Sequence, residues 1–177
     1  MRFRFALALI VLAALTRLLP HPPNFTPIGA MGLFGAAYFG NKRFALLIPF
    51  AALFLSDLIL NNVVYSQFYT SFTWVTSWWI YLGFALVMLA GYFMLRNNRN
   101  PARLAAASLT ASMLFFLVSN LSTWLGSGIY PQTFAGLMTC YAAGLPFLGN
   151  TVFADLFFSA VMFGSYSWFL KTKMQHA

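Results

Sequence analysis

The amino-acid sequence predicts an all-α, polytopic membrane protein, in which about six transmembrane helices form a single domain over residues 1–177. The chain is 61% hydrophobic and 7% charged, whereas charged residues make up about 25% of an average soluble domain. Long apolar runs, at 44–60, 74–95 and 104–118, fit the length of about 20 residues that a helix needs to cross a bilayer. The alternating pattern of a membrane β-barrel is absent from the sequence.

The first expected span follows the N-terminal arginines and occupies 3–19. Its outline also matches a signal peptide, but no suitable cleavage site follows and Arg17 interrupts the apolar run. The other spans are expected, in chain order, at 30–40, 43–62, 74–95, 104–125 and 149–170.

The segment 131–147 is apolar but short, and Pro146 leaves no room for a turn before the last span. A seventh span here would also put Lys171 and Lys173 on the opposite side from the other basic residues. We therefore expect 131–147 to be a separate interfacial or re-entrant helix at the outer surface.

The basic residues predict the orientation. With six spans, nine of the ten lysines and arginines fall in segments on one side: Arg2, Arg4, Lys42, Arg43, Arg96, Arg99, Arg103, Lys171 and Lys173. Because cytoplasmic loops carry an excess of Lys and Arg, both termini are expected in the cytoplasm. Trp74, Trp78, Trp79 and Tyr81 then lie at the outer end of their span, where an aromatic belt is expected.

The only two acidic residues, Asp57 and Asp155, both lie inside apolar runs. A charge at the centre of a membrane helix costs about 2.5–3.5 kcal/mol even on the insertion scale, so such groups normally face a partner or a wet cavity. Counting residues from the span ends places both aspartates and Arg17 at a similar depth, towards the outer side. Arg17 could pair with either aspartate, but one arginine cannot fully neutralise both.

Other polar side chains collect at the same end of the spans. We take them, with the two aspartates and Arg17, as candidate solute-binding residues: His21, Asn24, Asn61, Asn120, Trp124 and Asn150. The segments "PFAALFLSDLIL" (49–60) and "PFLGNTVFADLFF" (146–158) are similar around their aspartates, which would be consistent with an inverted repeat.

Gly32, Ala36 and Gly40 form a face of small residues that would let another helix approach closely. Two interpretations are open for this face. It could pack inside the bundle, or it could be a docking face for a partner membrane protein.

Several classes of function are excluded or disfavoured. The net charge of +8 does not indicate nucleic-acid binding, because no basic face with interleaved aromatics exists. The single Cys140 excludes an intramolecular disulfide and a multi-cysteine metal site, and nucleotide-binding and zinc-protease motifs are missing. We expect no cofactor, no metal site and no enzymatic activity; the "LSDL" and "FADL" contexts differ from the Gly-x-Gly-Asp motif of presenilin-type proteases.

Three stretches carry a resemblance to a family of uncharacterised bacterial inner-membrane proteins: "PHPPNFTPIGAMGLFGAAYFG", "FLSDLIL" and "YPQTFAGLMTCYAAGLPFLGNTVFADLFF". In length and six-helix layout that family is similar to the substrate-binding S components of energy-coupling factor (ECF) vitamin transporters. This resemblance implies a pocket that opens outward and a small-residue face that docks on a transmembrane coupling subunit served by two ATPases.

The chain departs from the better-known S components in its first helix, where their Ala-xxx-Ala pattern is missing. Docking would then use the face around Gly32. Solitary S-like proteins that import cobalamin ligate cobalt through a cysteine, and Cys140 is on the side that such a role requires; packing is the other interpretation of this residue.

The leading expectation is therefore a multi-pass protein of the bacterial inner membrane that binds a small solute, of the vitamin or micronutrient class, from the outer side and helps to import it. The first alternative is a membrane scaffold or assembly subunit that does not transport. A weaker alternative is an intramembrane enzyme built on the two aspartates.

Overall fold

The computed structural model describes residues 1–39 and 41–175, and this part of the chain is helical without β-strands. Its helices are α1 (Arg2–Thr16), α2 (Ile28–Tyr38), α3 (Lys42–Ile59), α4 (Trp78–Leu95), α5 (Pro101–Gly126) and α6 (Phe134–Gln175). A π-helical turn (Leu60–Val64) and a short 3-10 turn (Ser66–Phe68) continue from α3. The all-α prediction is confirmed.

Among the described residues, four helices are long and apolar enough to cross a membrane: Arg43–Val64, Trp78–Leu95, Pro101–Gly126 and Phe134–Gln175. They indicate an integral membrane protein. At about 1.5 Å per residue, the 15 residues of α1 extend for about 22 Å, which is less than the roughly 30 Å of a hydrocarbon core. The count of six spans stays a prediction.

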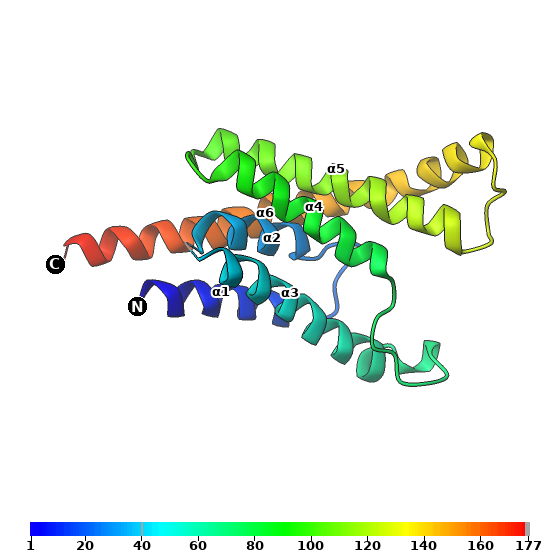
Figure 1. Ribbon diagram of the computed structural model, residues 1–177, viewed down its shortest axis with the longest axis horizontal. Helices are drawn as coiled ribbons and strands as arrows, with labels where there is room; N and C mark the ends of the chain where they lie inside the picture. Colours follow the sequence, from blue (N-terminus) through cyan, green and yellow to red (C-terminus); the bar gives the residue numbers. More distant parts are fainter. Residues whose placement is uncertain (40, 176–177) are drawn as a thin grey trace.

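The helices run up and down between two ends of the molecule (Figure 1). Both termini and the connection between α4 and α5 lie at one end. The connections that follow α3 and α5 lie at the opposite end.

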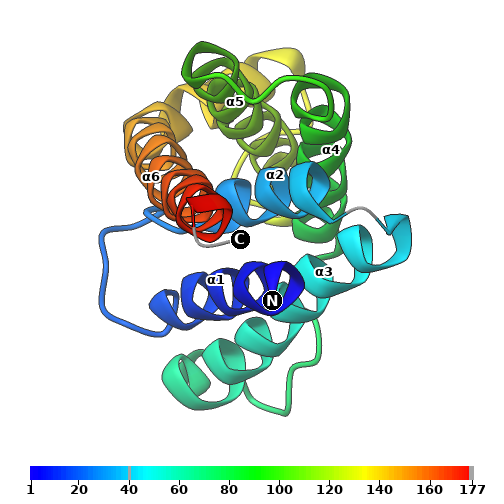
Figure 2. The same cartoon turned by 90° about the vertical axis from the view of Figure 1, so that its left-hand side faces the viewer.

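The short helix α2 occupies the centre of the bundle and contacts all five other α-helices. Seen from the end, it lies between the α1–α3 pair and the group formed by α4, α5 and α6 (Figure 2). Nine of its eleven residues are buried. An apolar segment of 10–14 residues is typical of a buried core helix, and the expected span at 30–40 takes this form.

The packing of α2 against α4 decides between the two interpretations of the small-residue face for one of its members, Gly32. Gly32 is buried, and a Cβ atom there would press on Phe84, Val87 and Met88 of α4. Gly32 therefore packs inside the bundle and is covered by α4, so it is not available to a partner. Ala36 is half-buried at the edge of a groove, and Gly40 lies outside the described residues.

The helix α6 corrects one boundary. We expected separate helices at 131–147 and 149–170, but Phe134–Gln175 is one continuous helix of 42 residues. Pro146 lies inside it without ending it. In membrane helices a proline is tolerated where local adjustment and neighbouring helices satisfy the freed backbone groups. At about 63 Å, α6 is about twice as long as a hydrocarbon core is thick, so it projects beyond the apolar layer.

Candidate functional site

Arg17 and Asp57 form a buried ion pair between the end of α1 and α3. The Arg17 Nη2 lies 2.7 Å from Asp57 Oδ1, and each residue is 7% exposed. The Nη1 of the same guanidinium donates to the Leu53 carbonyl at 3.3 Å and to the Ser56 hydroxyl. Tyr81, from α4, donates its hydroxyl to Asp57 Oδ2 at 3.0 Å. The prediction that Arg17 pairs with an aspartate is confirmed for Asp57.

Asp155 has different neighbours. Its carboxylate, 2% exposed, lies against the first turn of α2, where a Cβ atom on Gly29 would overlap it. The backbone of Gly29 and Ala30, in this first turn, lies close to it. Ser112 of α5 donates a hydrogen bond to Oδ2 at 2.7 Å. No cation pairs with Asp155 among the described residues, where the Arg17–Asp57 pair is the only salt bridge.

The position of Asp155 follows from the shortness of α2. The first N–H groups of a helix have no partner within the helix, and Pro27 at the N-cap contributes no side-chain hydrogen bond. Because α2 begins inside the bundle, those groups need a buried acceptor, and a carboxylate is also favoured by the helix dipole. Arg99 does the converse at the other end, donating to the Ala37 carbonyl at 2.5 Å.

A line of buried serines continues from Asp155 between α5 and α6. Ser112 donates to Asp155, and Ser108 donates to Ser159 at 2.9 Å. Ser108 and Ser112 are one helical turn apart on α5, as Asp155 and Ser159 are on α6. Small hydroxyl residues allow two membrane helices to approach closely and to hydrogen-bond across the interface.

A cavity of about 210 Å³ lies beside Asp155 and brings together residues from the loop before α2 and from five helices or their ends. Its lining consists of Arg17, Asn24, Thr26, Ile28, Gly29, Ile80, Phe115, Thr151 and Asp155. Three of the predicted site residues, Arg17, Asn24 and Asp155, thus border one space. Asp57 is not among the lining residues, and it reaches the cavity only through Arg17.

The loop before α2 is held against α6, and this places its polar side chains at the cavity. Asn150 donates from Nδ2 to the Pro23 carbonyl at 2.9 Å. The Phe25 ring packs against the rings of Phe153 and Phe158. Between these anchors Asn24 has φ +61°, a left-handed conformation that asparagine adopts more readily than most residues.

The two buried charged groups keep hydrogen-bonding capacity that their protein partners do not use. The Nε of Arg17 has no partner among the described residues. A carboxylate has about four acceptor positions, and Ser112 is the side-chain donor to Asp155 among the described residues. The cavity therefore borders two buried charged residues with unused hydrogen-bonding capacity, together with the side chains of Asn24, Thr26 and Thr151.

Four other predicted residues lie outside this cavity. His21 bonds only the neighbouring Pro22 carbonyl, and Asn61 is buried with its Nδ2 unpartnered in the turn after α3. Asn120 fills the space beside Gly144, where a Cβ atom would overlap its amide. Trp124 donates from Nε1 to the Pro131 carbonyl at 2.8 Å and braces the loop between α5 and α6.

Cys140 is buried in the same α5–α6 contact, and its Sγ donates to the Asn120 carbonyl at 3.4 Å. These contacts favour the interpretation that Cys140 has a packing role. Within the described residues no group of three or more His, Cys, Asp or Glu side chains could hold a metal ion.

Sequence reasoning missed several residues around the two carboxylates. Tyr81 was expected in an aromatic belt, but it turns inward to Asp57. Serine and threonine are common residue types, so the sequence alone does not mark Ser112, Thr26 or Thr151 as site residues. The spacing of Ser112 from Ser108, repeated by Asp155 and Ser159, was the available signal for a shared polar interface.

A model for a family of unknown function (DUF6580) matches residues 1–177. No curated protein and no solved structure matches the chain.

Proposed function

The chain belongs to DUF6580, a family whose function is unknown, and we propose that it binds a small polar solute in the cavity beside Asp155 and helps to import it. One observation carries the proposal. A cavity of about 210 Å³ inside an apolar bundle is bordered by a buried arginine and a buried carboxylate, each with unused hydrogen-bonding capacity. Buried polar atoms are normally hydrogen-bonded, so such a space suits a polar occupant.

The size and chemistry of the cavity limit the solute. At about 30 Å³ of liquid volume per water molecule, the space equals about seven waters, which favours a solute smaller than most vitamins. The Arg17 guanidinium in the cavity wall favours an acceptor atom of the solute, and the Asp155 carboxylate favours an N–H or O–H donor. A small molecule that carries both groups, such as an amino acid or a hydroxylated amine, fits best.

The proposal places the protein in the bacterial inner membrane with both termini in the cytoplasm. The positive-inside rule supports this orientation, because nine of ten basic residues belong to the segments that alternate with the aspartate-bearing end. Asn24 and Thr26 would then face the outer side, from which the solute enters. The chain has no nucleotide-binding motif, so import would depend on an ion gradient or on a partner such as a coupling subunit with ATPases.

The binding test is a thermal-shift screen of the purified protein in detergent against free amino acids, hydroxylated amines and water-soluble vitamins. We expect at least one small solute to raise the melting temperature, and Thr151→Val and Asp155→Asn to weaken its binding about tenfold or more. Thr151→Val removes a hydroxyl from the cavity wall and Asp155→Asn removes a charge from it; a lost hydrogen bond to a charged group costs about 1.5–3 kcal/mol.

Thr172→Val is the matched control. Thr172 lies on the same helix and, like Thr151, donates to the carbonyl four residues earlier at 3.1 Å, but it does not border the cavity. Binding that survives Thr151→Val and Asp155→Asn, or that Thr172→Val reduces equally, would rule out this cavity as the site. Absence of any binding solute would favour a scaffold role.

Orientation has its own test. In a Cys140→Ser background, a cysteine at Asn98 should react with a membrane-impermeant thiol reagent only from the cytoplasmic side. A cysteine at Gln67 should react only from outside. Reversed labelling would place the cavity on the cytoplasmic side and contradict uptake from outside.

The two alternatives predict other results. A scaffold subunit should co-purify with membrane partners and should tolerate Thr151→Val without functional loss.

An intramembrane enzyme built on both aspartates requires them to share one site. Asp57, however, is occupied by Arg17 and Tyr81, while Asp155 borders the cavity on its own.

A further inference from the structure

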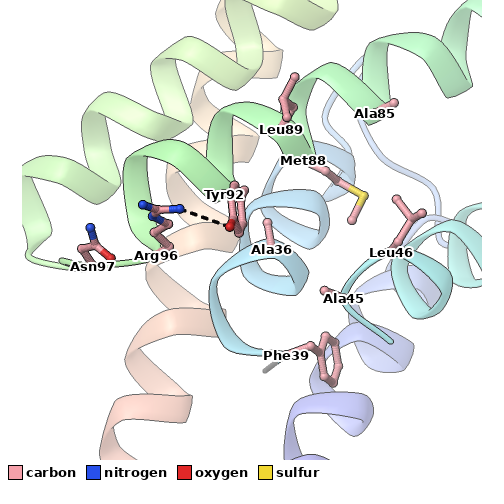
Figure 3. Close-up of a pocket in the computed structure, with 10 residues that line it drawn as sticks. All are labelled: Ala36, Phe39, Ala45, Leu46, Ala85, Met88, Leu89, Tyr92, Arg96 and Asn97. Carbon is pink, nitrogen blue, oxygen red and sulfur yellow. Dashed lines mark hydrogen bonds between the residues drawn. The ribbon is translucent and has the colours of Figure 1, made fainter. Parts of the chain in front are cut away.

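A second cavity, larger than the one beside Asp155, lies at the opposite, basic end of the bundle, in the groove between α2, α3 and α4. It measures about 710 Å³ and is open at the surface. Its lining is Ala36, Phe39, Ala45, Leu46, Ala85, Met88, Leu89, Tyr92, Arg96 and Asn97. Figure 3 shows these side chains, with the small Ala36 of α2 between α3 and α4.

The groove is apolar along its length and cationic at one end. From Ala85 to Met88 the α4 wall is hydrocarbon and thioether, and Arg96 and Asn97 follow where α4 ends. Arg96 is exposed and donates to the Tyr92 hydroxyl at 3.1 Å, the bond drawn in Figure 3. No carboxylate pairs with Arg96 in the described part of the chain.

The length of the groove matches one leaflet of a bilayer. Ala85 and Arg96 are separated by eleven residues of α4, or about 16 Å. Half of a hydrocarbon core is about 15 Å thick. The groove therefore extends from the level of the headgroups, at Arg96, to about the middle of the membrane, at Ala85. A partner helix would cross both leaflets, whereas a lipid acyl chain occupies one.

We propose that this groove is a specific site for an anionic phospholipid, with an acyl chain along α4 and the phosphate at Arg96. The chemistry of both ends supports this occupant. Arg99, in the neighbouring loop, adds positive charge at the same end, and basic residues at a membrane surface attract anionic lipids at about 1 kcal/mol each. Met88 supplies a flexible side chain that can adapt to a mobile chain.

The test titrates the full-length protein, purified in a mild detergent, with phosphatidylglycerol. Phosphatidylcholine and glycerol 3-phosphate are the comparison ligands, the first with the chains but no net charge and the second with the phosphate but no chains. Bound lipid is counted by native mass spectrometry, and the melting temperature is recorded. We expect one retained phosphatidylglycerol and a rise in melting temperature, with little effect from the other two ligands.

Two variants separate the parts of the site. Arg96→Gln should weaken phosphatidylglycerol binding about fivefold or more, because it removes the charge at the groove end. Ala85→Phe should weaken it by filling the apolar half. The matched controls are Arg103→Gln, which removes one charge at the same end, and Ala106→Phe, at an exposed α5 position outside the groove; both should bind as the parent does.

Four outcomes would overturn the proposal. Equal losses in Arg96→Gln and Arg103→Gln would indicate a diffuse attraction to the basic end. Equal binding of phosphatidylcholine would remove the role of charge, and binding of glycerol 3-phosphate alone would indicate a free-phosphate site. Full binding in Ala85→Phe would leave the groove to another occupant, such as a partner helix.

Discussion

Asp57 and Asp155 are the only acids of the chain and are buried to a similar degree, but the protein stabilises them in different ways. Asp57 faces a cation, Arg17, and a phenolic hydroxyl, Tyr81. Asp155 faces no cation in the described part of the chain; it accepts a hydrogen bond from Ser112 and lies against the first turn of α2. One carboxylate is held by another full charge, the other by a hydrogen bond and a helix dipole.

This difference indicates that Asp57 has a structural role, whereas Asp155 is free to contact a ligand. A buried ion pair is costly to break, because either partner alone is an uncompensated charge. It also uses the acceptor positions that a solute would need. A carboxylate without a paired cation has no fixed counter-charge, and it can face a cavity. Asp155 has that position, and Asp57 acts on the cavity only by holding Arg17.

The largest effect is expected from Arg17→Ala. The variant leaves Asp57 buried without its cation, so the free energy of unfolding in detergent should fall by about 3–5 kcal/mol. Adding Asp57→Asn should recover part of the loss, whereas adding Asp155→Asn should give a simple sum. A recovery with Asp155→Asn and none with Asp57→Asn would reverse the assignment of the pair.

Asp155→Asn should cost less, about 2–3 kcal/mol, because it removes a charge instead of leaving one uncompensated. The asparagine amide keeps the shape but turns one acceptor oxygen into a donor facing the N–H groups of Gly29 and Ala30. Denaturant titration of the single variant measures the loss. A cost as large as that of Arg17→Ala would contradict this difference between the two carboxylates.

Gly29→Ala should destabilise the protein by about 1–3 kcal/mol, the usual cost of overpacking. Its added Cβ would overlap the Asp155 carboxylate and push it away from α2. Gly164→Ala, in α6, is the matched control: nothing lies within 4 Å of a Cβ there, so it should be neutral or stabilising. If the two variants unfold at the same temperature, the carboxylate does not lie against α2.

The smallest effects are expected from Tyr81→Phe and Ser112→Ala, which each remove one neutral donor from a carboxylate. Each should cost about 1.5 kcal/mol, the lower end of the range for a hydrogen bond to a charged group, because the other contacts of each carboxylate remain. Ser112→Ala should be the larger of the two, because Asp57 keeps its ion pair when Tyr81 is changed and Asp155 has none. Melting temperatures of the two variants, measured side by side, test this order, and the reverse order would count against the comparison.

The sequence by itself determined that the protein is a helical membrane protein and that its buried acids need partners. Hydropathy and run length are local properties, so the apolar segments predict membrane helices directly, and four of them have the necessary length in the structure. The scarcity of acids, together with the cost of burying them, also predicted that Asp57 and Asp155 need partners. The sequence indicated that Arg17 could pair with an aspartate, but it left open whether the partner is Asp57 or Asp155.

Tertiary structure decided the rest. The strings "LSDL" and "FADL" look alike, but their surroundings are supplied by residues distant in sequence: Arg17 is 40 positions from Asp57, and Ser112 is 43 positions from Asp155. The burial of α2 sets where its free N–H groups must be satisfied, and packing also carries α6 through Pro146. Side-chain partners across helices depend on rotation and register, and hydrophobic periodicity within one segment does not specify either.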